Sequence, residues 1–154
     1  MKRLCHFHCL GLLCFLLLPM AAQSVEFQWQ NEAGETQSLA SYQGKPVLLH
    51  FWASWCPPCR SEMPDLVQWM KENPNVEVVI ISLDDDQADA QAFLKQHGMN
   101  LPANMANMRD MSALAVRGLP ASIVIDRNSN VAARYMGDLQ WLDASVSAKV
   151  LLWF

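Results

Sequence analysis

The stretch that decides the fold is Phe51-Trp52-Ala53-Ser54-Trp55-Cys56-Pro57-Pro58-Cys59. It continues an apolar run that starts at Val47, and an unbroken run of this kind predicts a strand buried on both faces. Two cysteines three positions apart at a helix start lie within disulfide reach, and the helix N-terminus favours the thiolate of the first one. The stretch therefore predicts a redox-active dithiol where a strand turns into a helix.

The helix after the dithiol is predicted from proline placement and apolar spacing. Pro57 and Pro58 occupy its first positions, where a missing N–H leaves no intrahelical bond unmade. The side chains Met63, Leu66, Val67 and Met70 repeat at helical spacing and predict the buried face. Pro64 removes one internal hydrogen bond and should kink the helix.

The remaining elements follow in a β-α-β-α order, with no internal repeat and no second domain. The first part is predicted to contain strands 26–29 and 36–39 around a turn at 31–35, followed by a helical turn at 40–44. After the dithiol helix come a strand at 76–83 and a helix with Ala90, Phe93, Leu94 and His97 on its buried face. The last part is predicted to be a loop at 101–107, a short helix at 109–116, strands 121–125 and 131–136, and a final helix capped by Asp138 and packed through Leu142, Val146 and Val150. The fold class is α/β, with a central mixed sheet flanked by helices and an N-terminal β-hairpin extension.

The N-terminal segment, residues 1–24, is predicted to be a targeting sequence rather than part of the domain, which spans 25–154. Lys2-Arg3 precedes an uncharged apolar run from Cys9 to Ala22, and Ala22-Gln23-Ser24 offers small residues for cleavage. The segment is either a cleaved export signal or, with residues 4–8 included, a membrane anchor of the roughly 20 residues that a bilayer requires. We therefore expect a periplasmic or other extracytoplasmic protein, free or anchored to the inner membrane.

Cysteine usage fits this location. Three of the five cysteines, Cys5, Cys9 and Cys14, lie in the N-terminal segment, so the domain carries only Cys56 and Cys59. One pair in an oxidising compartment indicates exchange chemistry rather than a structural framework. Without Lys2 and Arg3, nine of the 11 basic side chains remain against 15 acidic ones, which argues against nucleic acid as a partner.

The dithiol block, Pro64 and the later Gly118-Leu119-Pro120 together make the chain resemble the thioredoxin superfamily. Three further motifs resemble its exported TlpA and ResA type of thiol-disulfide oxidoreductase, and they are Gly44-Lys45-Pro46, Arg60-Ser61-Glu62-Met63-Pro64 and Val124-Ile125-Asp126-Arg127. The resemblance covers the chain from about Phe27 to its C-terminus.

The resemblance implies roles for individual residues. Cys56 would be the exposed nucleophile and Cys59 the resolving thiol, and Pro120 would be a cis-proline facing the disulfide. Leu119, before that proline, would help to select the partner. The exposed surface around the nucleophile, Trp55, Pro57 and Pro58, completes the predicted contact surface for a disulfide-containing protein substrate, and an upstream membrane thiol donor would recharge the dithiol without a cofactor.

Two residues carry a further hypothesis about protons. Glu62 lies three residues after Cys59, on the same side of the helix, and can relay the proton that Cys59 must lose. His50 stands six residues before Cys56, where the related proteins have aspartate or asparagine, and can accept the same proton or stabilise a thiolate as a cation. The alternatives are a solvated carboxylate and a neutral core histidine.

The sequence leaves three functions open. The leading one is an exported reductase of protein disulfides; the opposite direction of electron flow, disulfide donation, is the first alternative. The third is copper handling through the dithiol and the methionine cluster, which consists of Met99, Met105, Met108 and Met111. Flexible core packing explains the same methionines, and Asp84 to Asp86 is interpreted as a solvated loop with a helix cap.

Overall fold

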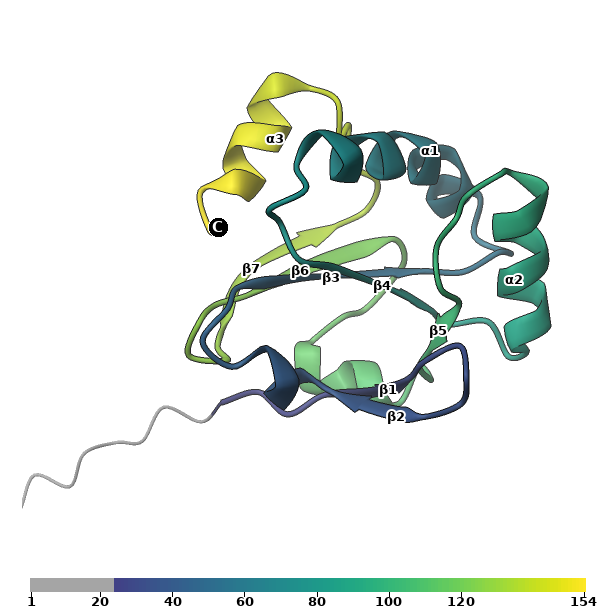
Figure 1. Cartoon of the computed structure of the whole chain (residues 1–154), viewed down its shortest axis with the longest axis horizontal. Coiled ribbons are helices and arrows are strands. Elements are labelled where there is room, and N and C mark those ends of the chain that lie inside the picture. The colour runs from purple at the N-terminus through teal and green to yellow at the C-terminus, as the bar shows by residue number, and fades with distance from the viewer. Residues whose placement is uncertain (1–23) are drawn as a thin grey trace, which may run out of the picture.

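The computed structural model describes residues 24–154, so the predicted targeting segment lies outside the described residues apart from Ser24. A seven-stranded mixed sheet forms the centre of the molecule, in the order β2-β1-β5-β4-β3-β6-β7 (Figure 1). Its strands are β1 (Gln28–Gln30), β2 (Thr36–Ser38), β3 (Val47–Trp52), β4 (Val78–Ser82), β5 (Asn104–Met105), β6 (Ala121–Ile125) and β7 (Val131–Met136). Strand β3 pairs in parallel with β4 and antiparallel with β6, as a mixed sheet requires.

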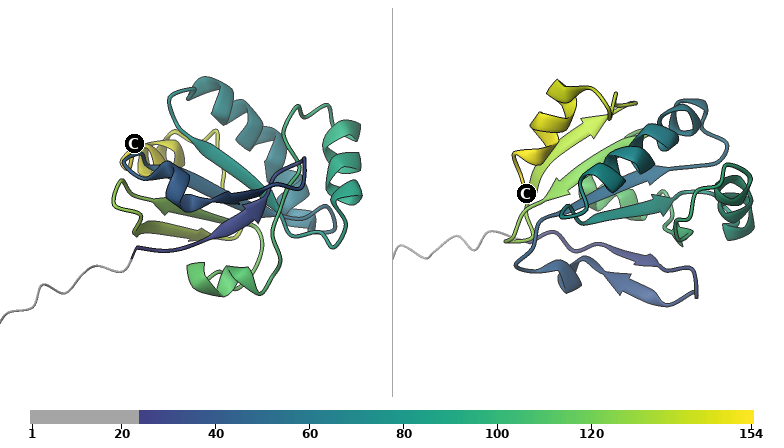
Figure 2. Two further views of the ribbon diagram at one scale, coloured as in Figure 1. Left: turned by 60° about the horizontal axis from the view of Figure 1, so that its bottom comes forward. Right: turned by 45° about the horizontal axis from the view of Figure 1, so that its top comes forward.

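The helices lie on both sides of this sheet. They are α1 (Pro57–Glu72), α2 (Gln87–Gln96) and α3 (Ala144–Leu151), with two 3-10 helices, η1 (Leu39–Tyr42) and η2 (Asp110–Leu114). Figure 1 shows α1 and α3 over one face, while the β1–β2 pair crosses beneath the other face beside the 3-10 helices. The two turned views in Figure 2 show the same arrangement from below and from above.

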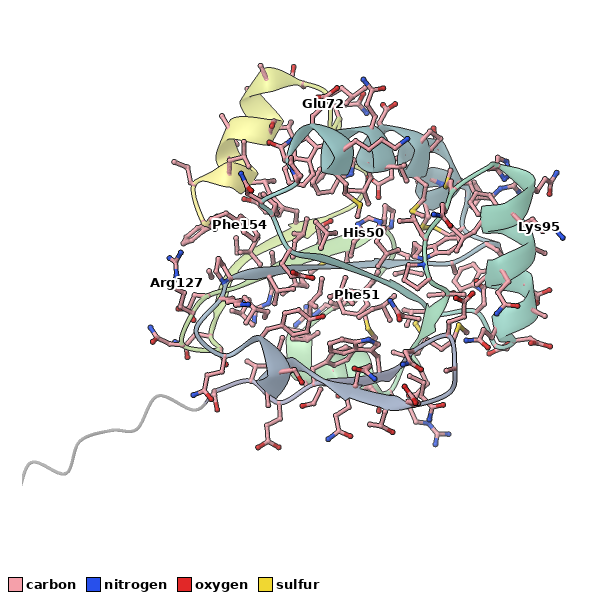
Figure 3. All side chains as sticks on the ribbon, in the orientation of Figure 1. His50, Phe51, Glu72, Lys95, Arg127 and Phe154 are labelled. Atoms are coloured by element: carbon pink, nitrogen blue, oxygen red, sulfur yellow. A yellow bond between two sulfur atoms is a disulfide. The ribbon has the colours of Figure 1, made fainter. Side chains whose placement is uncertain are left out.

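Strand β3 divides the core in two because successive side chains of a strand point to opposite faces. Leu48 and Trp52 belong to the cluster under α1, which also contains both cysteines of the dithiol. Leu49 and Phe51 belong to the cluster on the other face, which is closed by β1, η1 and η2. Figure 3 shows His50 and Phe51 pointing in opposite directions from the strand. His50 therefore lies on the side of the sheet that carries the dithiol helix.

The strands predicted at 121–125 and 131–136 are confirmed with their bounds, and the predicted start of α1 at the two prolines is confirmed as well. Other predictions were wrong in detail. Residues 104–105 form the short strand β5 inside the predicted loop, because they pair with β4 and β1. The short helix predicted at 109–116 is the 3-10 helix η2, whereas the helical turn predicted at 40–44 is confirmed as the 3-10 helix η1, which begins one residue earlier.

Two helix faces differ from the apolar pattern. In α1 the fully buried side includes Glu62 and Trp69, whereas Val67 and Met70 are only partly buried. His97 is exposed just beyond α2, where its Nδ1 lies 2.9 Å from the carbonyl oxygen of Phe93. Helical spacing predicts the buried face of a helix from the positions of its apolar side chains. It does not predict the burial of a carboxylate such as that of Glu62, which has polar partners in the interior.

The last helix begins later than predicted. Its N-cap is Asp143, whose side chain accepts from the backbone N–H groups of Ser145 and Val146. Asp138 and Leu142 precede the helix and are both exposed. Val150 is the buried contact of α3. Among residues 24–154, no helix has the length and apolar character needed to cross a bilayer.

Candidate active site

The dithiol lies at the junction between β3 and α1. Cys56 is the N-cap of the helix, and its sulfur accepts a hydrogen bond from the backbone N–H of Cys59 at 3.4 Å. The two sulfurs form a disulfide. Cys59 is fully buried, and Cys56 retains 4% of its surface. Both cysteines are therefore buried in this disulfide form, and the predicted exposure of Cys56 is not seen.

The loop before β6 lies at the same end of the sheet. Ala121 pairs with Phe51, so Pro120 stands next to the point where β3 ends and the dithiol segment begins. The Leu119–Pro120 peptide bond is cis, as the resemblance implies. Pro120 is buried, and Leu119 is partly exposed and packs against both cores.

The surface beside Cys56 includes the residues that the sequence analysis expected there. Trp55 is 59% exposed, and both Pro57 and Pro58 are exposed on the first turn of α1. Trp55 is thus a large exposed aromatic side chain next to Cys56, of the kind that is enriched at protein interfaces.

His50 is completely buried and makes two polar contacts. Its Nδ1 lies 2.9 Å from the hydroxyl oxygen of Ser122, the residue opposite it on β6. Its Nε2 lies 3.4 Å from Oε1 of Glu62. Burial lowers the pKa of His50 to about 3. A serine hydroxyl both donates and accepts, so either neutral tautomer of the imidazole is accommodated.

Glu62 approaches the histidine from α1, one turn after Cys59. Its Oε2 accepts a hydrogen bond of 2.6 Å from the backbone N–H of Leu139. Burial raises the pKa of this carboxyl group to about 7; the hydrogen bond from Leu139 and the nearby indole N–H of Trp141 oppose the rise, and the charge of Asp138 adds to it. A carboxyl group with this pKa gains and loses a proton at neutral pH.

Trp141 completes the buried cluster. Its ring packs edge-on against His50, with the centroids 6.1 Å apart, and it also contacts Trp69. The indole N–H opposes the rise in the pKa of Glu62, yet it makes no hydrogen bond of good geometry. Among the described residues, the buried side-chain polar atoms without a hydrogen-bond partner are His50 Nε2, Glu62 Oε1 and Trp141 Nε1. All three belong to this one cluster of His50, Glu62 and Trp141.

Comparison with known proteins places this geometry in a family. The AhpC/TSA family model matches residues 20–137. The chain belongs to the AhpC/TSA family. Among its curated relatives, the thiol-disulfide oxidoreductase ResA of Bacillus thuringiensis (strain Al Hakam) is 32% identical over 124 residues, which are 79% of this chain and 72% of the relative. ResA of Halalkalibacterium halodurans is 28% identical over 76% of this chain and 68% of its own length.

Solved structures of related proteins share the fold of this AhpC/TSA family member. A thiol:disulfide interchange protein of the thioredoxin family from Chlorobium tepidum is 30% identical, with a TM-score of 0.66 over 85% of this chain and 98% of its own. The exposed lipoprotein thioredoxin of Streptococcus pneumoniae is 25% identical, with a TM-score of 0.67 over 82% and 98%. The fold is thioredoxin-like, and the protein is a thiol-disulfide oxidoreductase of the ResA type.

The methionine cluster is not brought together in this family member. Met99 and Met105 pack in the core under α1, whereas Met111 is buried in the core on the opposite face. Met108 is largely exposed. The side chains therefore do not converge on one metal-binding position.

Three contributors to the site were missed by the sequence analysis, namely Ser122, Trp141 and Asp84. Asp84 is buried and not a solvated loop residue, because its carboxylate accepts from the N–H and hydroxyl of Ser54 and from the hydroxyl of Ser82. Its position directly after a buried strand, beside the carboxyl end of parallel β3, was the available signal. Asp86 caps α2 through the N–H of Ala88, as predicted for this run.

Proposed function

We propose that the protein is an exported reductase of protein disulfides in which Cys56 attacks the partner. The Cys56 thiolate forms a bond to one sulfur of the partner disulfide, the partner S–S bond breaks, and the first partner thiolate leaves. The helix N-terminus favours the thiolate of Cys56. Trp55, Pro57 and Pro58 on one side, and Leu119 and Pro120 on the other, form the surface that holds the partner during this step.

Cys59 completes the exchange. Its thiol loses a proton, its sulfur bonds to Cys56, and the mixed disulfide breaks to release the second partner thiolate. Two electrons pass from the dithiol to the partner, and the internal disulfide closes. The proton goes to the buried pair of Glu62 and His50, which lies one helical turn from Cys59 and has an acceptor that titrates near neutral pH.

The observation that carries the reducing direction is the buried contact between neutral His50 and Glu62. A strongly oxidising dithiol requires a stabilised reduced form, in which positive charge favours the thiolate. Here the histidine remains uncharged and its neighbour is an acid, so this pair supplies no cation to a thiolate. The reduced dithiol is therefore not stabilised by the pair, and this favours electron donation.

An upstream membrane thiol donor returns two electrons and two protons to the disulfide after each cycle. Export through the N-terminal segment brings the domain to the compartment where such partners occur. Fractionation of cells that produce the full chain, with mass spectrometry of its N-terminus, tests both export and cleavage. Recovery of the intact chain only in the cytoplasm contradicts this part of the proposal.

The direction is tested by the reduction potential of the Cys56–Cys59 pair, measured against glutathione buffers by thiol alkylation. We expect a value at or below about −230 mV, in the range of thioredoxin and the glutaredoxins. A value near about −120 mV, that of a strong oxidant, overturns the proposal and favours disulfide donation.

Trapping tests the order of the two thiols. Cys59→Ser should accumulate mixed disulfides through Cys56, because the resolving sulfur is gone. Cys56→Ser should accumulate none, and this variant serves as the matched control. Equal trapping by both variants contradicts the assignment of Cys56 as the nucleophile.

A further inference from the structure

A groove of about 910 Å³ is lined by β1 and by residues that follow β4 and β5. Figure 1 shows β1 on the side of the sheet away from α1 and α3. One wall is β1 with the residues before it, and the other is the segment from Met105 to Asp110. The floor includes Leu83 and Asp84, which follow β4. The dithiol chemistry described above does not use this groove.

The walls of the groove separate because β1 and β5 pair at a single position, Gln30 with Met105. The next residue, Ala106, bonds through its N–H to the carbonyl oxygen of Ser82 on β4, and no further residue of the described chain pairs with β1 on this side. The result is a sheet edge that is open towards the groove along the first part of β1.

The open edge presents free backbone groups. The carbonyl oxygen of Phe27 accepts the N–H of Leu39, so Phe27 and the alternate residues of β1 bond towards β2. The N–H and C=O of Gln28 consequently point to the other edge, where no residue of the described chain bonds to them. An edge of this kind is a template for an added strand.

The side chains around the groove carry a bias of charge. Glu26, Asp85 and Asp110 are exposed along the walls, while Arg109 is the basic residue among the groove-lining side chains. Met108, 59% exposed, adds apolar surface between them. An extended segment that alternates basic and apolar side chains complements both features.

The groove leads to the redox site at two points. Asp84 on its floor holds the N–H and hydroxyl of Ser54, two residues before Cys56. Leu83 and Met108 also line a smaller pocket of about 70 Å³, whose lining includes Leu119, the residue before the cis-proline. A chain that lies in the groove is therefore close to the surface where a partner disulfide is attacked.

We propose that this groove, which we call the β1 groove, binds an extended basic segment of the protein substrate by adding it as a strand to the edge at Gln28. This inference rests on the proposed function, because it makes the bound segment part of the disulfide-bearing partner. Strand addition supplies affinity through the backbone, and the acidic walls select the basic partner.

Binding is tested with a labelled peptide of about eight alternating Lys and Val residues, the length of an ordinary strand. Its affinity for the oxidised full-length protein is measured by fluorescence anisotropy and compared with a peptide in which Glu replaces Lys. We expect the Glu peptide to bind at least about tenfold more weakly, and the Lys peptide to weaken as salt is added. Equal affinity for the two peptides overturns the proposal.

Two pairs of variants localise the binding. Gln28→Pro removes the N–H that faces the groove and should weaken the Lys peptide about fivefold, whereas Gln28→Ala keeps that N–H and should bind as wild type. The double variant Asp85→Asn with Asp110→Asn should weaken it by a similar factor. Asp65→Asn with Glu72→Gln, on α1 and the opposite face, is its control. If Gln28→Pro fails to fold, the charge variants decide, and wild-type binding by them overturns the proposal.

The connection to catalysis is tested separately. A disulfide attached to the Lys peptide should be reduced with a kcat/KM about tenfold above that of the Glu peptide, and the advantage should disappear in the Asp85 and Asp110 double variant. Reduction of a small aromatic disulfide should be unchanged in that variant. Loss of exchange with the small disulfide as well points to failure of the proposed function, whereas intact exchange without preference for Lys overturns the groove alone.

Discussion

Nε2 of His50 and Oε1 of Glu62 lie 3.4 Å apart, in side chains that are 0% and 3% exposed. Burial lowers the pKa of the histidine to about 3 and raises that of the carboxyl to about 7, so the pair avoids two buried charges at neutral pH. The carboxyl group of Glu62 therefore titrates near neutral pH, beside a histidine that stays neutral. Substitution of either buried residue should therefore have a larger effect than substitution of a polar residue on the surface.

The stability of the oxidised protein should report the raised pKa of Glu62. Between pH 4.5 and about 7 the folded carboxyl binds more protons than the unfolded one, so its contribution to stability is lost as the pH rises through this window. Glu62→Gln removes that loss. Relative to wild type, its free energy of unfolding should increase between these pH values by up to about 3 kcal/mol.

His50 acts in the opposite sense, because its pKa falls from 6.5 to about 3 and its contribution to stability increases as pH rises between those values. In wild type the two slopes oppose each other, and Glu62→Gln should reveal the rise caused by His50. Urea unfolding at several pH values measures both effects. Glu72→Gln, at the exposed end of the same helix, is the control. A pH-independent difference between Glu62→Gln and wild type contradicts the prediction.

The rate of resolution should depend on the same pair. In wild type, release of a preformed mixed disulfide should accelerate as the pH rises through about 7, where Glu62 becomes able to accept the proton of Cys59. Glu62→Gln should remove this dependence and slow resolution about 100-fold, and His50→Asn should slow it about tenfold. Stopped-flow measurement of partner release gives both rates.

The first attack by Cys56 supplies the internal comparison. Its pH dependence follows the thiolate of Cys56 and should change much less in Glu62→Gln and His50→Asn than that of resolution. Equal changes in the two steps would mean that the substitutions disturb the helix as a whole. Unchanged profiles in both variants would return His50 and Glu62 to a purely structural role.

Much of the fold could be predicted from local sequence because the deciding signals are local. The apolar run before the dithiol, the two prolines that begin α1 and the turn between β6 and β7 all act through neighbouring residues. Helical spacing also places Glu62 one turn after Cys59 on α1. The bounds of β6 and β7 and the start of α1 were confirmed, whereas helical spacing misassigned part of the buried faces of α1 and α3.

The residues that sequence reasoning missed act across long separations. Ser122 reaches His50 only because β6 lies beside β3 in a register that no local pattern specifies. Trp141 stands in an irregular segment between β7 and α3, where neither strand nor helix spacing marks a buried face. Asp84 resembles its exposed neighbours in an acidic run, and its burial depends on the loop that contains Ser54. Tertiary contacts decided all three.

Asp84 should stabilise the segment that leads into the dithiol. Asp84→Asn replaces one acceptor oxygen with a donor group that faces the Ser54 N–H and the serine hydroxyls, so we expect a loss of about 1–3 kcal/mol in the free energy of unfolding. Asp85→Asn, at the next and exposed position, should change it by less than about 0.5 kcal/mol. If chemical unfolding shows the same loss of free energy for both substitutions, the loss comes from the change in net charge and not from the contacts of Asp84.

Trp141 should tune Glu62 through its indole N–H. Trp141→Phe keeps an aromatic ring but removes the N–H that opposes the rise in the pKa of Glu62. The pH midpoint of the resolving step should therefore move to higher pH, with a loss of about 1–3 kcal/mol in stability from reduced packing. Trp69→Phe is the matched control, because Trp69 packs against Trp141 but donates its N–H to Ser147. It should reduce stability by a similar amount and leave the midpoint in place, whereas a shift of equal size in both variants would show that packing alone sets the proton affinity of Glu62.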